Sequence, residues 1–267
     1  ELQPGLDVLS PGGAVGTRRS RSSPYRGAMI PTIFKWATTQ DKSIEEQLSM
    51  GIRYFDLRVA HKLKDPSSDL YFTHVIYTHL TVLETLSSVA LWLNSHPKEV
   101  VILALSHFEG ISDELHQSFI FSLKKMFGSK LCPHKVSVPT LRSLWAAGQQ
   151  VILSYDSQHP LRHPELWPDI PYWWANQCTA KEVISYLDWN KEQGRPDRCF
   201  ITENLRQSLR TITFSNWECL RGWVEKQTPG SGPQSLNIIA GDFVGPLPLC
   251  SLIIALNQKL LRKKSSR

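Results

Sequence analysis

Three side chains suited to phosphate chemistry lie close together in segment 51–78, which reads GIRYFDLRVAHKLKDPSSDLYFTHVIYT. Asp56 and Arg58 are two residues apart in an apolar run, so in a strand they share one face. His74 lies near the end of a second such run, after a polar turn. A guanidinium binds phosphate through two parallel hydrogen bonds, and imidazole and carboxylate groups transfer protons. The segment therefore predicts two short strands that carry a phosphate-binding and proton-transferring site.

The rest of the pattern predicts strands that alternate with helices. A short helix that Ser43 caps precedes the first strand. Strands are expected at 53–59, 70–77, 99–108, 150–155, 170–176, 199–202 and 236–243. Helices are expected at 80–95, 111–127, 139–147, 179–193, 217–226 and 247–261.

This alternation is typical of βαβ units and a parallel sheet. Seven strands are one short of a (β/α) barrel of eight. The sequence therefore predicts an α/β fold, a TIM-type (β/α) barrel that lacks or replaces its first strand. A doubly wound open sheet is the alternative, although no GxGxxG turn supports its dinucleotide-binding version.

Composition separates a head from the rest of the chain. Residues 1–30 are rich in Gly, Pro, Ser and Arg without a sustained period, so we expect a disordered head. Residues 31–267 are expected to form one barrel domain with a short basic C-terminal tail. Two segments of the chain could supply a replacement strand, 13–17 and 29–34.

Charge and cysteine usage limit the partners and the compartment. The net charge is +6, and part of it lies in basic clusters in the head and at the C-terminus. Such clusters are usually solvated tails, and the alternative is weak attraction to anionic lipids. No basic stripe interleaved with aromatics indicates nucleic acid. Five cysteines without a CxxC pair argue against a disulfide framework and a structural zinc site. No apolar run approaches the length of a membrane span. We expect a cytoplasmic monomer that attaches peripherally to membranes.

Six motifs resemble one known family. They are GIRYFDLRV, FTHVIYT, HPKEVVILALSHFEG, LRSLWAAGQQVILSYD, PELWPDIPYWWAN and NIIAGDFVG. In this order they resemble the phosphatidylinositol-specific phospholipase C X-domain-containing proteins, eukaryotic relatives of the bacterial enzymes. The resemblance covers about residues 31–261. It implies a TIM-type barrel and a phosphodiesterase that cleaves inositol phospholipid to diacylglycerol and cyclic inositol phosphate.

The resemblance also implies roles for individual residues. In that family a first histidine takes the proton of the inositol 2-hydroxyl, and a second protonates the diacylglycerol oxygen. His74 matches the second histidine. Asp56 and Arg58 match an Asp-x-Arg pair of the metal-free members, in which the arginine neutralises phosphate charge, so neither calcium nor another cofactor is expected. Asp242 matches the aspartate that orients the first histidine.

The chain departs from the family at the general base. The family carries its first histidine in a Gly-Ser/Thr-His-Asp motif, which these 267 residues lack. The first histidine here, His61, follows the first expected strand. The chain is therefore either an active phospholipase or a catalytically inactive form that binds inositol phosphate headgroups without turnover. An aggregation-prone truncated product is a third reading.

Polar residues near other expected strand ends complete the candidate site, because parallel barrels place their sites at those ends. Tyr155, Trp174 and Asn176 are expected to line the inositol pocket. His107 and Glu109 are assigned to substrate binding by position. Alternation places one of Trp173 and Trp174 in the core.

Overall fold

A computed structural model describes residues 37–264, with gaps at 75, 136–138, 176, 178, 195–201, 205–216, 231, 233 and 246–247. The head at 1–30, and with it both candidate replacement strands, lies outside these residues. Among the cysteines described, Cys132, Cys219 and Cys250 are free thiols.

The strands form two sheets. The larger sheet has the order β3-β2-β1-β4-β5-β6 and the smaller one the order β7-β8-β9. Strands β1, β4, β5 and β6 run parallel, as do β7, β8 and β9. The bounds are β1 (Tyr54–His61), β2 (Leu70–His74), β3 (Ile76–Thr81), β4 (Val101–Glu109), β5 (Val151–Tyr155), β6 (Leu166–Trp167), β7 (Tyr172–Trp174), β8 (Thr202–Asn204) and β9 (Ile238–Ala240).

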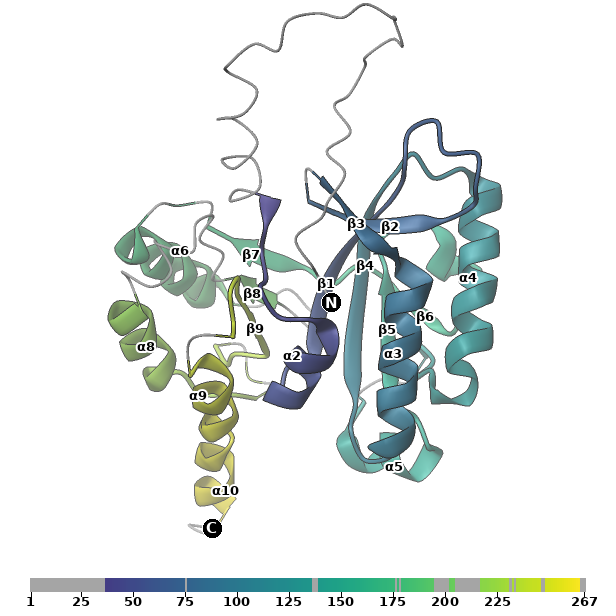
Figure 1. Cartoon of the computed structure of the whole chain (residues 1–267). Helices are drawn as coiled ribbons and strands as arrows, with labels where there is room; N and C mark the ends of the chain where they lie inside the picture. Colours follow the sequence, from purple (N-terminus) through teal and green to yellow (C-terminus); the bar gives the residue numbers. More distant parts are fainter. Residues whose placement is uncertain are drawn as a thin grey trace, which may run out of the picture.

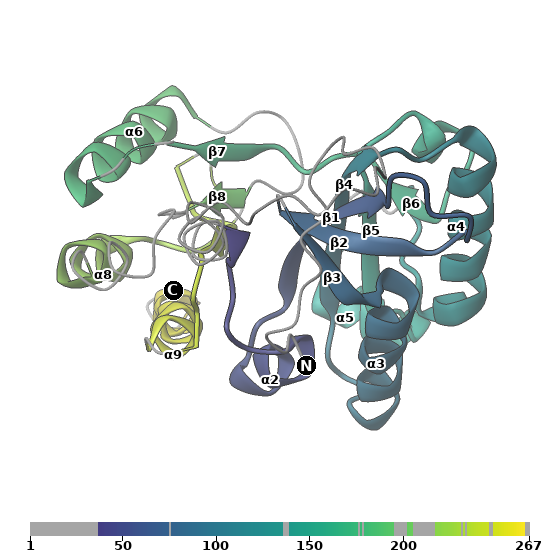
Figure 2. The same cartoon turned by 45° about the horizontal axis from the view of Figure 1, so that its top comes forward.

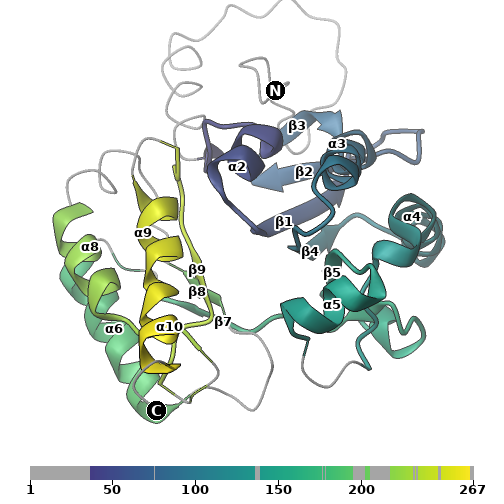
Figure 3. The same cartoon turned by 90° about the horizontal axis from the view of Figure 1, so that it is seen from below.

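Helices cover the outside of both sheets, as Figures 1 and 3 show. None in the described part of the chain is long and apolar enough to cross a membrane. The expected helix at 247–261 is divided into α9 and α10. The α-helices are α2 (Ile44–Met50), α3 (Val82–Ser95), α4 (Asp113–Phe127), α5 (Leu141–Ala147), α6 (Ala180–Gln193), α8 (Trp217–Lys226), α9 (Leu249–Leu256) and α10 (Gln258–Lys264), with 3-10 turns at Gly128–Lys130 and His159–Leu161.

The expected strand at 70–77 is instead two antiparallel strands. β2 pairs with β1, and β3 folds back on β2 with His74 opposite Ile76. β2 lies beside the carboxyl end of β1, and β3 lies on the far side of β2 (Figure 2). No Gly, Pro or Asn marks this reversal in LYFTHVIYT, so the apolar run reads as a single strand. The sheet is therefore mixed at this edge.

Strand alternation sorts the β1 side chains into two layers. Phe55, Leu57 and Val59 pack in the core under α3 and α4. Tyr54, Asp56 and Arg58 face the opposite side, where they line cavities. The predicted shared face of Asp56 and Arg58 is confirmed.

Local contacts fix the start of β1. Ser43 caps α2 in a reciprocal capping box with Glu46. Gly51 ends the helix at φ +105°, and a Cβ there would lie 2.9 Å from Ile254 Cδ1 of α9. Arg53 Nε then donates to Glu99 Oε2 at 2.8 Å. The turn from α2 into β1 is thus held against α9 and the start of β4.

Candidate active site

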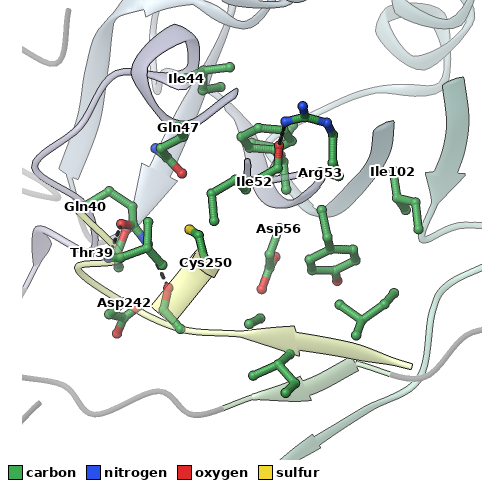
Figure 4. Close-up of a pocket in the computed structure, with 18 of the residues that line it drawn as sticks. Thr39, Gln40, Ile44, Gln47, Ile52, Arg53, Asp56, Ile102, Asp242 and Cys250 are labelled. Atoms are coloured by element: carbon green, nitrogen blue, oxygen red, sulfur yellow. Dashed lines mark hydrogen bonds between the residues drawn. The ribbon is translucent and has the colours of Figure 1, made fainter. Parts of the chain in front are cut away.

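Two cavities meet along the inward face of β1. The larger, about 760 Å³, lies between β1 and β9, and the smaller, about 240 Å³, extends toward β4 and β5. Asp56 and Arg58 line both cavities. The larger cavity has a volume typical of ligand sites. Figure 4 shows Asp56 from β1 and Asp242 from the end of β9 on this cavity.

His74 enters the larger cavity from β2 in a defined orientation. Its Nδ1 lies 3.1 Å from the backbone oxygen of Ala37. A carbonyl oxygen only accepts hydrogen bonds, so Nδ1 carries a proton and donates it to this bond. Nε2 is therefore the nitrogen that gains or loses a proton. The side chain is half-buried, so it is held in place and still reaches the cavity.

The segment 37–41 ties the end of β9 to this histidine. Thr39 O accepts from Phe243 N at 2.8 Å. The Gln40 amide donates to Gly241 O at 2.8 Å and accepts from Val244 N at 3.1 Å. Because the same segment supplies the Ala37 carbonyl, these bonds bring buried Asp242 and His74 to one cavity.

The smaller cavity gathers titratable groups from three strands and a loop. Arg58 comes from β1, His107 from β4, Asp156 from the end of β5 and Asp169 from the loop after β6. Burial raises the pKa of Asp156 above its ordinary value, and the nearby Asp169 charge adds to the effect. Burial lowers the pKa of His107, and the positive charge of Arg58 lowers it further. Both shifts favour the neutral forms.

The predicted site residues therefore separate into two groups. Asp56, Arg58, His74 and Asp242 lie together on the larger cavity, and His107 lies on the smaller one. Four others, Tyr155 among them, lie outside both cavities or outside the described residues. Glu109 is exposed at the end of β4, Trp174 is 45% exposed on β7, and Asn176 is not described. The expected alternation is confirmed, since Trp173 is in the core.

Tyr155 is not brought into the site. It faces the helix layer, is fully buried, and its hydroxyl bonds His116 Nδ1 of α4 at 2.7 Å. Burial raises its pKa. Neighbouring residues of a strand point to opposite faces, so it is Asp156, one residue later, that enters the cavity. The aromatic pocket residue expected here therefore belongs to the core.

We expect Tyr155→Phe to lower the free energy of unfolding by about 1–3 kcal/mol, because it leaves buried His116 without this partner. Urea unfolding at pH 8 measures the loss, with Tyr186→Phe on α6 as the matched control. Equal stability of the two variants would contradict the prediction.

The buried His116 also predicts a pH dependence of stability. Burial lowers its pKa below the ordinary 6.5, with His159 adding to the effect. The folded state then binds fewer protons than the unfolded state, so this stabilisation is complete above about pH 6.5 and is lost as the pH falls. Urea unfolding at pH 8 and pH 5.5 should show a decrease that is smaller in His116→Gln. If stability decreases as much in His116→Gln as in the wild type, other groups cause the pH dependence.

Tyr54, Asp169 and Tyr172 line the smaller cavity and were not predicted from the sequence. Tyr54 lies two residues before Asp56, so strand alternation alone would have placed it on the same face as Asp56 and Arg58. Asp169 lies in a loop between Pro168 and Ile170, and Tyr172 begins β7. No local sequence pattern predicts that these two residues line the cavity. They reach it because the chain from Asp169 to Tyr172 lies near β1 in the folded protein.

Comparisons with known proteins identify the family. The family model PI-PLC X 1 matches residues 28–185. The chain is 46% identical over 244 residues to human PI-PLC X domain-containing protein 1, covering 86% of this chain and 75% of that protein. The zebrafish (Danio rerio) protein of the same name is 47% identical over 242 residues, covering 85% and 78%.

Solved structures confirm the predicted TIM-type barrel fold. The Listeria monocytogenes phosphatidylinositol-specific phospholipase C matches with a TM-score of 0.57 and 16% identity, covering 86% of each chain. The Staphylococcus aureus enzyme matches with a TM-score of 0.57 and 14% identity, covering 84% of this chain and 86% of that one. With the family model and the curated relatives, these matches lead to one conclusion: the chain belongs to the PI-PLC X domain family.

Proposed function

We propose that this chain is a phosphoric diester hydrolase of the phosphatidylinositol phospholipase C class. It cleaves an inositol phospholipid to diacylglycerol and cyclic inositol phosphate, as a cytoplasmic monomer attached peripherally to the membrane. The observation that supports this most directly is that Arg58, Asp56 and His74 line one cavity in a member of this family.

Each of these side chains has a defined part in the reaction. The Arg58 guanidinium binds the phosphodiester and stabilises the charge that develops on its oxygens. Asp56 shares the same strand face, so a headgroup that reaches Arg58 also reaches this carboxylate. His74 donates the proton on Nε2 to the departing glycerol oxygen, while its Nδ1–H stays bound to Ala37 O.

Product release tests the proposal directly. The purified chain is incubated with phosphatidylinositol vesicles, and cyclic inositol phosphate is followed by phosphorus NMR. Phosphatidylcholine vesicles are the substrate control, and His74→Ala is the protein control. Release from phosphatidylinositol alone is expected. A rate no higher than that of His74→Ala would refute the activity for this chain.

We expect calcium chelation to leave this rate unchanged, because Arg58 supplies the positive charge at the phosphate. Among the described residues, no group of three His, Cys, Asp or Glu side chains could hold a metal ion. The rate is measured with and without EGTA, and a calcium-dependent phospholipase in the same buffer verifies chelation. Loss of activity that calcium restores would contradict this prediction.

A second candidate function is headgroup binding without turnover. The observation that favours it is the lack of a Gly-Ser/Thr-His-Asp motif in the sequence. This function predicts saturable binding of inositol phosphate in calorimetry, lost in Arg58→Ala, together with no product from vesicles. Product release by the wild-type chain would exclude it.

A further inference from the structure

A β-bulge interrupts β4 beside Arg58. Arg58 pairs with Ser106, and the next paired residues are Ala60 and Glu109, so three steps on β4 match two on β1. The two residues inside this irregularity, His107 and Phe108, have φ of +73° and +46°. Non-glycine residues in this left-handed region are uncommon and occur at functional sites. Bulges of this kind redirect side chains.

The bulge exchanges the faces of His107 and Phe108. Along β4, Leu103 and Leu105 pack in the core under the helices, so unbroken alternation would send His107 to the same side. Instead, Phe108 takes that side and stacks on the Tyr155 ring, with centroids 4.3 Å apart. His107 lines the smaller cavity together with Arg58. The backbone thus turns toward this cavity an exposed imidazole that a regular strand would direct toward the helices.

Each of the two cavities that Arg58 lines also has one histidine in its lining. His74 lies on the larger cavity and His107 on the smaller one, and Arg58 lines both. Ser106 Oγ lies 2.9 Å from His107 Nδ1. A serine hydroxyl both donates and accepts, and in the tautomer whose Nδ1–H donates to Ser106 Oγ the lone pair of Nε2 can accept a proton. The two cavities that share Arg58 thus supply two imidazoles, one for a base and one for an acid.

Partial burial and the charge of Arg58 favour the neutral form of His107, which is the form that can act as a base. Its pKa is lowered by burial and by Arg58 of β1. Asp56 of β1, Asp156 after β5 and Glu109 of β4 act in the opposite direction. The remaining titratable groups on the cavity are Asp169, Tyr54 and Tyr172. An acceptor that is neutral at pH 7 is ready to remove a proton.

We propose that His107 is the general base of this chain, taking the proton of the attacking inositol hydroxyl. The inference rests on the proposed function and names a proton acceptor for the same site. His107 Nε2 takes the hydroxyl proton as the inositol oxygen bonds to phosphorus. The bond from phosphorus to the glycerol oxygen breaks, and that oxygen takes the proton of His74. The reaction ends with His107 protonated and His74 neutral.

The test compares His107→Gln with His74→Ala on two substrates. His107→Gln should lower kcat on phosphatidylinositol vesicles by about 10²–10⁴-fold and leave vesicle binding unchanged. On an inositol phosphodiester with a nitrophenol leaving group, which needs no acid, His74→Ala should recover its rate while His107→Gln should not. Exposed His79 of β3 provides the matched control, His79→Ala, with the wild-type rate.

A pH profile separates a base from a residue that only shapes the site. Wild-type kcat/KM should fall on the acid side along a limb that lies below pH 6.5, because the pKa of His107 is lowered. This limb should be lost in His107→Gln. Ser106→Ala, which removes the Nδ1 partner, should keep the limb and move its midpoint. Melting temperatures of all variants are recorded beside the rates.

The outcomes separate the inference from the proposed function. If the wild type is active and folded His107→Gln matches it, His107 is not the base and the proposed function stands. If the wild type releases no product, both proposals fail. If His107→Gln does not fold, the wild-type profile and Ser106→Ala decide. An acid limb that is missing, or one that Ser106→Ala does not move, overturns the inference.

Discussion

Arg58→Ala is expected to lower kcat/KM for phosphatidylinositol by about 10²–10³-fold, the cost of removing one preorganised group that stabilises transition-state charge. Arg58 is the cationic side chain that lines both cavities. It can therefore bind a phosphodiester that lies on the cavity of His74 or on the cavity of His107. Calorimetry with inositol phosphate should show weaker binding as well. Initial rates on vesicles provide the kinetic measurement.

Arg58→Lys distinguishes charge from geometry. A lysine keeps the positive charge but loses the planar fork that binds two phosphate oxygens, so we expect its rate to lie between wild type and Arg58→Ala. Arg221→Ala on α8 is the matched surface control, because its ion pair with Glu225 is exposed and such pairs contribute little. Wild-type kinetics in Arg58→Ala would remove this residue from the proposed site.

His74→Ala is expected to lower kcat by about 10²–10⁴-fold, the usual contribution of a positioned acid or base. The loss should appear in kcat rather than in KM, since His74 acts on the leaving oxygen. Its Nδ1 bond to Ala37 O fixes the ring, and the remaining nitrogen gives the proton. Rates on phosphatidylinositol vesicles over a range of lipid fractions separate the two constants.

The choice of substrate tests this role of His74. A nitrophenol leaving group departs without a proton, so His74→Ala should approach the wild-type rate on that substrate. His79→Ala should match wild type on both substrates. If the rate of His74→Ala falls equally on both, His74 serves binding or folding and the acid is another group.

Most elements of the fold could be predicted from the sequence because their signals are local. The capping box of Ser43 and Glu46 and the spacing of apolar residues along α3 and α4 follow from contacts within a few residues. The shared face of Asp56 and Arg58 follows from strand periodicity alone. The six motifs are likewise short, continuous segments, so the sequence alone indicates the family and His74.

Contacts between distant segments decided the rest of the site. The bulge at His107 arises from pairing with β1, and Asp169 reaches the cavity because the loop after β6 packs near β1. Tyr155 shows most clearly what could not be predicted from the sequence. It lies in the core, whereas Asp156, the next residue, lines the cavity.

The sequence by itself determined the family, the alternation of strands and helices, and the Asp56, Arg58 and His74 set. The sequence assigned His107 to the site only by its place at a strand end, and the tertiary structure decided how it reaches the cavity that Arg58 lines. Alternation along an isolated strand directs His107 toward the helices. Pairing with β1 introduces an extra residue, and the bulge turns the imidazole inward because Phe108 fills the core position beside Tyr155.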